Sequence, residues 1–201
     1  MARMKVEHAA EVIASEEALA HLARDPVMAR LIERHGPYRW GLHPVFPSLV
    51  RAVVGQQLSN AVARTMFRRV AEATGLEPAR LLALGEDGLR ELGLARAKGR
   101  ALVELARAQR EGYFEGLEAL PDKEAAERLV HLRGVGPWTA QMVLIFSLGR
   151  MDVWPTGDLG MVRQAERLYG LEGRAAVETL GERFRPWRSA AAHYLWAETD
   201  A

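Results

Sequence analysis

Residues 132–163 decide the fold of this chain, and they read LRGVGPWTAQMVLIFSLGRMDVWPTGDLGMVR. Gly134 and Gly136 flank one aliphatic residue, and an apolar run then extends from Thr139 to Leu148. Two glycines at this spacing allow a tight turn whose backbone N–H groups point outward at the start of a helix. Such a helix start attracts phosphate. Taken alone, the pattern is equally typical of an ordinary helix–helix turn.

One carboxylate, Asp158, follows this hairpin on an irregular segment that contains Pro155 and Gly157. Residues 159–162 read as the start of a helix, so Asp158 is predicted to be its N-cap. Gly149 is expected to close the preceding helix. A side chain at the mouth of a helix is both held and exposed, so capping is compatible with a catalytic role for Asp158.

The composition describes a globular protein without thiol chemistry. The chain has 201 residues, of which 49% are hydrophobic and 26% charged, and it contains no cysteine. Disulfides, zinc–thiolate sites and iron–sulfur clusters are therefore excluded. No apolar run is long enough to span a bilayer and no signal-peptide core is present, so we expect a cytoplasmic protein without membrane contact. The net charge of +1 neither demands nor forbids a nucleic-acid partner.

Helix signals recur along the chain. Ser15 and Asp25 predict two helix starts, whereas the residues before Ser15 alternate weakly and fit a short strand or a loose arm. Residues 35–44 are rich in Gly and Pro and predict a loop. Further helices are predicted near residues 47–54, 60–73, 78–84, 86–92, a stretch ending at 110, 123–131 with Asp122 as cap, 159–169, 174–184 and 187–198.

These signals predict an all-α fold, because no convincing strand pattern occurs after Ser15. We expect a two-lobed helical bundle with a helix-hairpin-helix motif. Residues 47–149 would form the central helical lobe that ends in the hairpin, and residues 1–46 with 150–201 a second lobe made by both termini. The active site is expected in the inter-lobe cleft, where Asp158 would lie.

Several polar groups leave alternatives open. His35 and His43 match no metal-binding spacing and are predicted to be surface or turn histidines. Gln56 and Gln57 lie on a helix-to-helix turn without a local partner, so they are either solvated or reach a polar ligand. The remaining cluster is either a solvated face or a phosphate contact, and it consists of Arg96, Lys98 and Arg100.

Four motifs occur in an order that resembles a known family. They are Gln56-Gln57-Leu58-Ser59, the hairpin residues 132–140, Arg150-Met151-Asp152-Val153, and Pro186-Trp187-Arg188-Ser189 followed by Trp196. Over residues 46–196 the chain thereby resembles the helix-hairpin-helix DNA glycosylase superfamily. Within it, the chain is similar to the 3-methyladenine DNA glycosylase II branch (AlkA/Mag-like).

The resemblance implies a monofunctional DNA glycosylase of base excision repair. Its partner would be double-stranded DNA containing alkylated bases of the 3-methyladenine or 7-methylguanine type. A base inside a duplex must be flipped out before its N-glycosidic bond can be hydrolysed. A carboxylate stabilises the oxocarbenium character of the sugar, and a base alkylated at a ring nitrogen is already a good leaving group.

The resemblance also assigns roles to individual residues. Asp158 matches the catalytic aspartate, and Trp138 and Trp196 match aromatic residues of the base pocket, although without the family both tryptophans would be read as core. The DNA-binding positions are Gln57, which would fill the gap left by the flipped nucleotide, and the hairpin residues whose backbone N–H groups would hold a phosphate, Gly134, Gly136 and Thr139. A monovalent cation could bind the backbone carbonyls of Val130, Leu132 and Val135.

Departures from the family's patterns narrow the expected reaction. Bifunctional glycosylase/lyases of the superfamily carry a lysine where this chain has Trp138, so a Schiff-base route has no obvious amine. Gly157 replaces an acidic residue that relatives commonly carry, and the N-terminal β-rich domain of some relatives is expected to be missing. We expect a monomer that needs no cofactor and no metal, and that associates with the nucleoid through DNA.

Two alternative functions stay open at this point. The hairpin could belong to a non-enzymatic DNA-binding module, or the enzyme could excise other damaged bases. Substrate range depends on pocket width, and the side chains expected to influence it are Phe46, Met142 and Tyr194.

Overall fold

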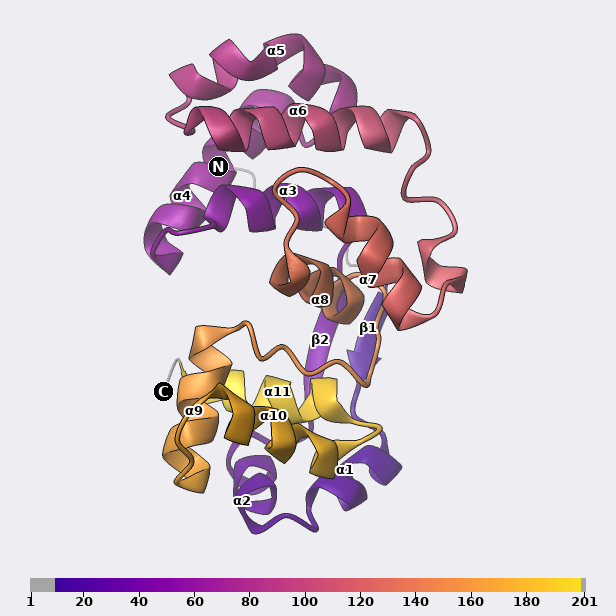
Figure 1. Cartoon of the computed structure of the whole chain (residues 1–201), viewed down its shortest axis with the longest axis vertical. Coiled ribbons are helices and arrows are strands. Elements are labelled where there is room, and N and C mark those ends of the chain that lie inside the picture. The colour runs from indigo at the N-terminus through magenta and orange to yellow at the C-terminus, as the bar shows by residue number, and fades with distance from the viewer. Residues whose placement is uncertain (1–9, 200–201) are drawn as a thin grey trace. The chain divides into compact units, whose positions relative to one another are not determined.

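The computed structural model describes residues 10–199, which form eleven α-helices, two short 3-10 helices and one two-stranded sheet (Figure 1). The predicted all-α class is therefore confirmed, with the small sheet as an addition. The chain divides into two compact units, Met1–His43 with Leu144–Ala201 as unit 1 and Pro44–Val143 as unit 2. The lobe limits and the inter-lobe cleft expected from the sequence stay predictions. No helix in the described part of the chain is both long and apolar enough to cross a membrane.

Unit 2 is built entirely from helices among its described residues. They are α3 (Val45–Gly55), α4 (Asn60–Thr74), α5 (Pro78–Glu91), α6 (Arg96–Arg110), η1 (Leu117–Ala119), α7 (Asp122–Val130) and the start of α8 (Pro137–Phe146). Within α5, Gly85 has φ +65° and separates two helical stretches. The sequence predicted two short helices there, and the left-handed glycine is the reason they are distinct.

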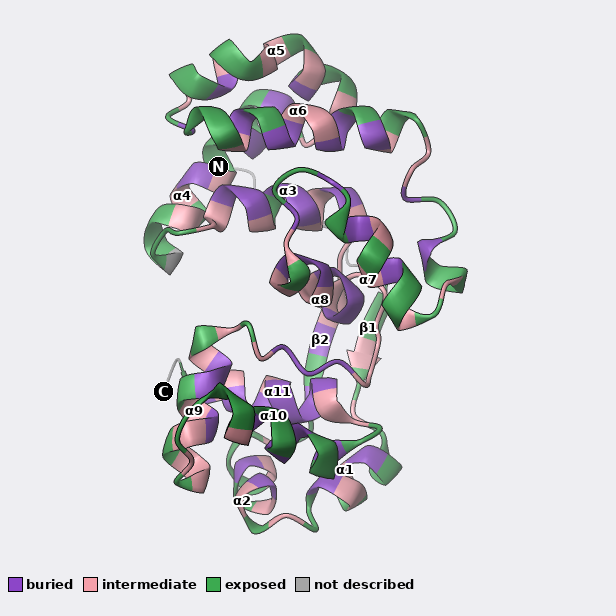
Figure 2. Cartoon of the chain, viewed as in Figure 1, coloured by how far each residue is buried: buried purple, intermediate pink, exposed green. Residues whose placement is uncertain are grey.

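The core of unit 2 forms around α3, which packs against α4 and α6 and of which several residues are buried (Figure 2). Its buried residues include Leu49, Val50 and Val53. Next to it, α5 and α6 pack on each other, and Gly99 of α6 lies at their contact, where a Cβ would meet the backbone oxygen of Glu86 at the ordinary van der Waals distance of 3.6 Å. The helix predicted near residues 47–54 is therefore present as α3, and its buried residues belong to this core.

Unit 1 combines helices from both ends of the chain. They are α1 (Glu16–Leu22), α2 (Pro26–His35), α9 (Leu159–Tyr169), α10 (Arg174–Gly181), η2 (Glu182–Phe184) and α11 (Arg188–Ala197). The predicted caps are confirmed: the Ser15 hydroxyl accepts a hydrogen bond from the N–H of Ala18, and the Asp25 carboxylate accepts bonds from Val27 and Met28. Asp122, by contrast, is the first residue of α7 and Pro121 occupies its N-cap position.

The sheet of unit 1 corrects the predicted loop at residues 35–44. Strand β2 (Arg39–Leu42) lies inside that segment and pairs antiparallel with β1 (Ala10–Ile13). Tertiary packing explains the strand, because Trp40 is buried and its indole Nε1 donates to the carbonyl of Ile145 at 3.3 Å. Flanking Gly and Pro residues hid this four-residue strand from local sequence patterns.

The helix of the hairpin ends earlier than its apolar run predicted. Its last residue is Phe146 rather than Leu148. The carbonyl of Phe146 accepts a hydrogen bond from the N–H of His43 at 2.8 Å, and Arg150 N donates to the Leu144 carbonyl at 2.9 Å. Donors from outside the helix therefore satisfy its terminal carbonyls, which would otherwise be left without partners.

Candidate active site

Asp158 caps helix α9, as the sequence predicts. Its Oδ1 accepts a hydrogen bond from the N–H of Met161 at 2.8 Å. The backbone N–H of Asp158 in turn donates to the carbonyl of Pro155 at 2.8 Å. The carboxylate is thus fixed at the positive end of the helix dipole, which favours an ionised acid.

The structure brings Trp196 to this carboxylate. The indole Nε1 of Trp196, on α11, donates to Asp158 Oδ1 at 3.1 Å. On its other side the Trp196 ring packs against Phe146, with ring centroids 5.6 Å apart and planes tilted by 37°. Both Asp158 and Trp196 are partly exposed. An acid and an indole that were predicted to share one site are therefore in direct contact within unit 1.

Gly160 lies next to the Asp158 carboxylate and, because it has no side chain, does not crowd it. A Cβ at Gly160 would lie 3.2 Å from Asp158 Oδ1 and 3.8 Å from Thr199 Cγ2. The first of these distances is shorter than ordinary van der Waals contact, so a side chain would press on the carboxylate. The sequence showed a glycine early in a helix, but only the fold shows why a smaller residue suits this position.

Glu198, just beyond α11, was not singled out from the sequence. Its side chain is only 4% exposed and is surrounded by basic side chains from α2 and α9. Arg34 Nη1 donates at 2.9 Å, His35 Nε2 lies at 2.8 Å, and Arg167 Nη2 donates at 3.0 Å. The hydrogen bond with His35, together with those from the two arginines, lowers the pKa of Glu198 from 4.5 to about 2. Glu198 therefore connects the helices that carry Asp158 and Trp196.

Replacing Glu198 with glutamine is expected to lower the free energy of unfolding by about 2 kcal/mol near neutral pH, because bonds between charged groups are lost. The folded pKa of about 2 lies below the ordinary 4.5. The stabilisation by Glu198 is therefore complete above pH 4.5 and is lost as the pH falls toward 2. Urea denaturation across that window measures the difference. Glu178→Gln, at an exposed position of α10, is the control, and a pH-independent difference would contradict the assignment.

The hairpin lies in unit 2, between α7 and α8. Its turn is closed by a hydrogen bond from the N–H of Val135 to the carbonyl of Leu132 at 3.1 Å. Gly134 has φ +78°, which is the left-handed region that favours glycine. Thr139 is 2% exposed, so its side chain is packed inside the unit and only its backbone fits the predicted phosphate role. The turn and helix start predicted from the two glycines are both present.

The turn between α3 and α4 holds the two glutamines. Gln57 is exposed and has φ +59°, an unusual value for a residue with a side chain. Gln56 was expected to lack a local partner, but its Nε2 donates a hydrogen bond to the carbonyl of Gly134 at 2.8 Å. The glutamine turn is therefore attached to the hairpin, while Gln57 stays at the surface.

A protein-family model covers both the hairpin and the capping aspartate. The family model for "HhH-GPD superfamily base excision DNA repair protein" matches residues 50–189. The chain belongs to the HhH-GPD superfamily. The family predicted from the four motifs is thereby confirmed.

Individual members of the superfamily match most of the chain. DNA-3-methyladenine glycosylase 1 of Schizosaccharomyces pombe is 32% identical, over 96% of this chain and 92% of the relative. DNA-3-methyladenine glycosylase 2 of Escherichia coli is 30% identical, over 94% of this chain and 72% of the relative. The solved structure of S. pombe 3-methyladenine DNA glycosylase Mag1 in complex with abasic DNA matches with a TM-score of 0.83 at 31% identity, covering 92% of this chain and 97% of that chain.

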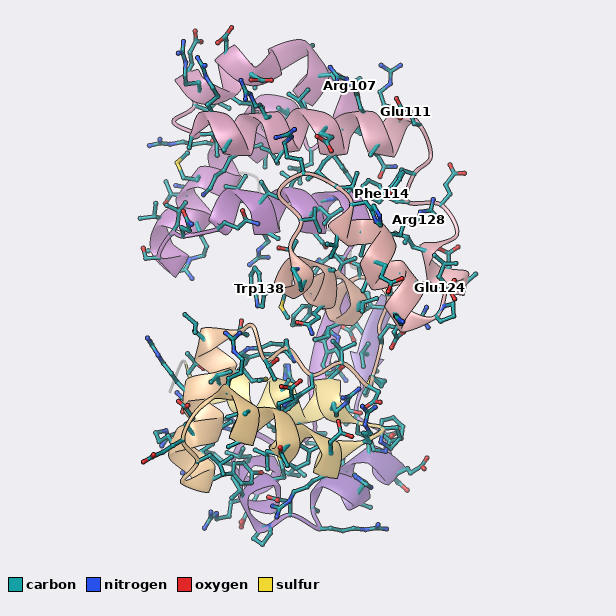
Figure 3. All side chains as sticks on the ribbon, viewed as in Figure 1. Arg107, Glu111, Phe114, Glu124, Arg128 and Trp138 are labelled. Carbon is teal, nitrogen blue, oxygen red and sulfur yellow. The ribbon has the colours of Figure 1, made fainter. Side chains whose placement is uncertain are left out.

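Trp138 is the remaining aromatic residue predicted for the HhH-GPD base pocket. It lies in the first turn of α8 and is partly exposed (Figure 3). Asp158 and Trp196 belong to the other unit, so the meeting of all three in one pocket stays a prediction. Trp40 and Trp154 are core residues, since both are buried.

The residues expected to set pocket width differ in exposure. Phe46 is 4% and Tyr194 1% exposed, and the Tyr194 hydroxyl donates to the carbonyl of Gly36 at 3.0 Å. Both side chains are therefore part of the cores of their units. Met142, on α8, is partly exposed and is the one of the three that stays a candidate.

The basic cluster at the start of α6 separates into different roles. Arg100 Nε pairs with Glu86 at 3.2 Å on the surface. Lys98 instead points at backbone carbonyls of the same unit, Val54 and Gln56. A solvated face therefore fits Arg100, whereas neither reading made from the sequence describes Lys98.

Cation binding was considered for acidic and histidine side chains and for the backbone carbonyls of the hairpin. Within residues 10–199, no group of three or more His, Asp or Glu side chains is arranged to hold a metal ion. Val130 is the last residue of α7, and Leu132 and Val135 follow it in the turn, where carbonyls are not committed to a continuing helix. Binding of a monovalent cation by these three carbonyls stays a prediction.

Proposed function

We propose that the protein is a monofunctional DNA glycosylase that extrudes alkylated bases from duplex DNA and hydrolyses their N-glycosidic bonds. The observation that carries this proposal is the placement of Asp158, whose Oδ1 is bonded to both the Met161 N–H and the Trp196 indole. The names of the relatives, DNA-3-methyladenine glycosylases, support alkylated bases as the substrate class. The complex of Mag1 with abasic DNA supports DNA as the partner.

The chemistry needs one acid and no metal. Cleavage of an N-glycosidic bond builds positive charge on the sugar ring, and the ionised Asp158 stabilises that charge and orients the attacking water. Because Asp158 is already oriented by two donors, little reorganisation is required when the charge develops. An alkylated base that carries a positive charge leaves without protonation by a second acid.

The base pocket uses aromatic faces. A cationic base over an indole ring gains about 0.5–2 kcal/mol, which an undamaged neutral base does not gain in the same way. Trp196 is held next to the acid, and Trp138 supplies the second face in this proposal. Selectivity for alkylated bases follows from charge rather than from a pattern of hydrogen bonds.

Lyase activity is not expected, because the amine that it requires is missing from the hairpin helix. The position at which bifunctional relatives are expected to carry lysine is Trp138, whose indole cannot form a Schiff base. Of the two lysines in the described region, Lys98 is bound to two carbonyls and Lys123 is on the exposed side of α7. The reaction therefore stops at an abasic site.

A panel of duplexes, each with one modified base, tests the proposal. The purified protein is expected to release free 3-methyladenine and 7-methylguanine without added metal, and to leave the strand intact until alkali is added. Strand breaks before alkali would overturn the monofunctional assignment. Binding without release of any base would instead indicate a non-enzymatic DNA-binding module, and release of only oxidised or deaminated bases would indicate another substrate class.

A further inference from the structure

The turn that carries Gln57 is strained and exposed, yet the backbone that leads into it is held by hydrogen bonds. Gln57 has φ +59°, and Gln57, Leu58 and Ser59 are all exposed. A side-chain-bearing residue keeps a left-handed conformation only where the surrounding structure imposes it. The contacts that impose it therefore indicate what this turn does.

Lys98 supplies the first of these contacts. Its Nζ, in the first turn of α6, donates to the carbonyl of Val54 at 2.8 Å and to that of Gln56 at 2.6 Å. Both carbonyls lie at the C-terminal end of α3, where helix carbonyls lack partners and the dipole attracts a cation. One partly buried ammonium group thus fixes the backbone immediately before Gln57.

Gln56 supplies the second contact, and it extends to the hairpin. While its carbonyl accepts from Lys98, its side-chain Nε2 donates to the carbonyl of Gly134 at 2.8 Å. Gly134 itself packs on α6, since a Cβ there would lie 2.8 Å from the Cβ of Ala101. Helix α6 therefore touches both the hairpin turn and the glutamine turn, and Gln56 connects the two turns directly.

We propose that Lys98, acting through Gln56, is a positioning residue that holds the exposed Gln57 turn at a fixed distance from the phosphate-binding turn of the hairpin. This inference rests on the proposed function. A side chain that replaces a flipped base must enter the stack while the hairpin grips the backbone of the same DNA. If the two turns moved independently, the Gln57 turn would lose conformational freedom on each insertion, and extrusion would be less favourable.

If Lys98 and Gln56 position the Gln57 turn, removing their hydrogen bonds should impair unstacking of the bases much more than it impairs DNA binding. The variant Lys98→Met keeps an unbranched side chain of similar length but loses the hydrogen bonds to the carbonyls of Val54 and Gln56. We expect its affinity for a duplex with a stable abasic-site analogue to stay within threefold of wild type, because the hairpin is intact. The fluorescence increase of a 2-aminopurine placed beside that site, which reports unstacking, is expected to fall at least threefold.

Base release gives a second readout, because a damaged fold would slow release from paired and bulged lesions alike. Single-turnover release from a paired lesion is expected to fall about tenfold or more in Lys98→Met. The rate is expected to return to within threefold of wild type when the lesion is in a bulge, where it needs no extrusion. Gln56→Leu, which removes only the bond to Gly134, should show the same pattern and serves if Lys98→Met does not fold. Lys123→Met, at a side chain that is 86% exposed, is the matched control.

The outcomes separate this inference from the proposed function. Equal losses on paired and bulged lesions, or unchanged 2-aminopurine fluorescence in both variants, would overturn the positioning role. A wild-type protein that does not unstack the reporter would overturn it as well. If the wild type releases no base, the proposed function fails, whereas the fluorescence comparison still decides whether Lys98 positions the Gln57 turn.

Discussion

Replacing Asp158 with asparagine is expected to reduce the single-turnover release of alkylated bases by about 10²–10⁴-fold. The fold should survive, because an asparagine Oδ1 can still accept from the Met161 N–H and the Trp196 indole, which lie at 2.8 and 3.1 Å in the native site. Asparagine is also as good an N-cap as aspartate. What the variant loses is the negative charge that the proposed mechanism places beside the sugar.

Two measurements make this result specific to the charge. The melting temperature of Asp158→Asn should stay within a few degrees of wild type, and its affinity for abasic-analogue DNA should be largely unchanged. Trp196→Phe keeps an aromatic face but removes the donor to Asp158, so a smaller decrease in base release is expected from it. Wild-type release by Asp158→Asn would remove this residue from the reaction and with it the proposed mechanism.

Most of the helices could be predicted from local signals, because caps and breakers act within a few residues. Ser15, Asp25 and Asp158 each cap the helix that the sequence assigned to them, and Gly85 divides two helical stretches. The strand β2 (Arg39–Leu42) was missed, since it depends on pairing with β1 and on the burial of Trp40. Such interactions leave no periodic trace in a segment full of Gly and Pro.

The candidate site shows the same limit in its polar interactions. Family motifs pointed to Asp158 and Trp196, but their hydrogen bond joins positions 38 residues apart and could not be derived from spacing. Glu198 gave no signal and looked like an ordinary charge at a helix end, whereas Lys98 was noticed only as part of a basic cluster. Both are defined by partners on other helices, which only the fold brings close.

Replacing each of the two hairpin glycines with alanine is expected to affect a different property, stability for Gly134 and DNA affinity for Gly136. Gly134→Ala should lower the free energy of unfolding by about 2–4 kcal/mol, since φ +78° disfavours a side chain and the new Cβ would lie 2.8 Å from that of Ala101. Gly136→Ala should leave stability nearly unchanged, because a Cβ there meets no protein atom within 4 Å. Its effect is expected on DNA affinity, which should fall about tenfold or more if backbone N–H groups at the start of α8 approach a phosphate closely.

The contrast between the two variants decides what each glycine is for. Gly116→Ala is the control for backbone strain alone, since Gly116 has φ +73° and open space around its Cβ position. Gly134→Ala should be less stable than that control by the cost of the overlap with Ala101. Urea denaturation measures stability, and fluorescence anisotropy with an abasic-analogue duplex at one fixed salt concentration measures affinity. If Gly136→Ala bound DNA as tightly as wild type, the hairpin would be a structural turn, and the phosphate contact would have to lie elsewhere in the protein.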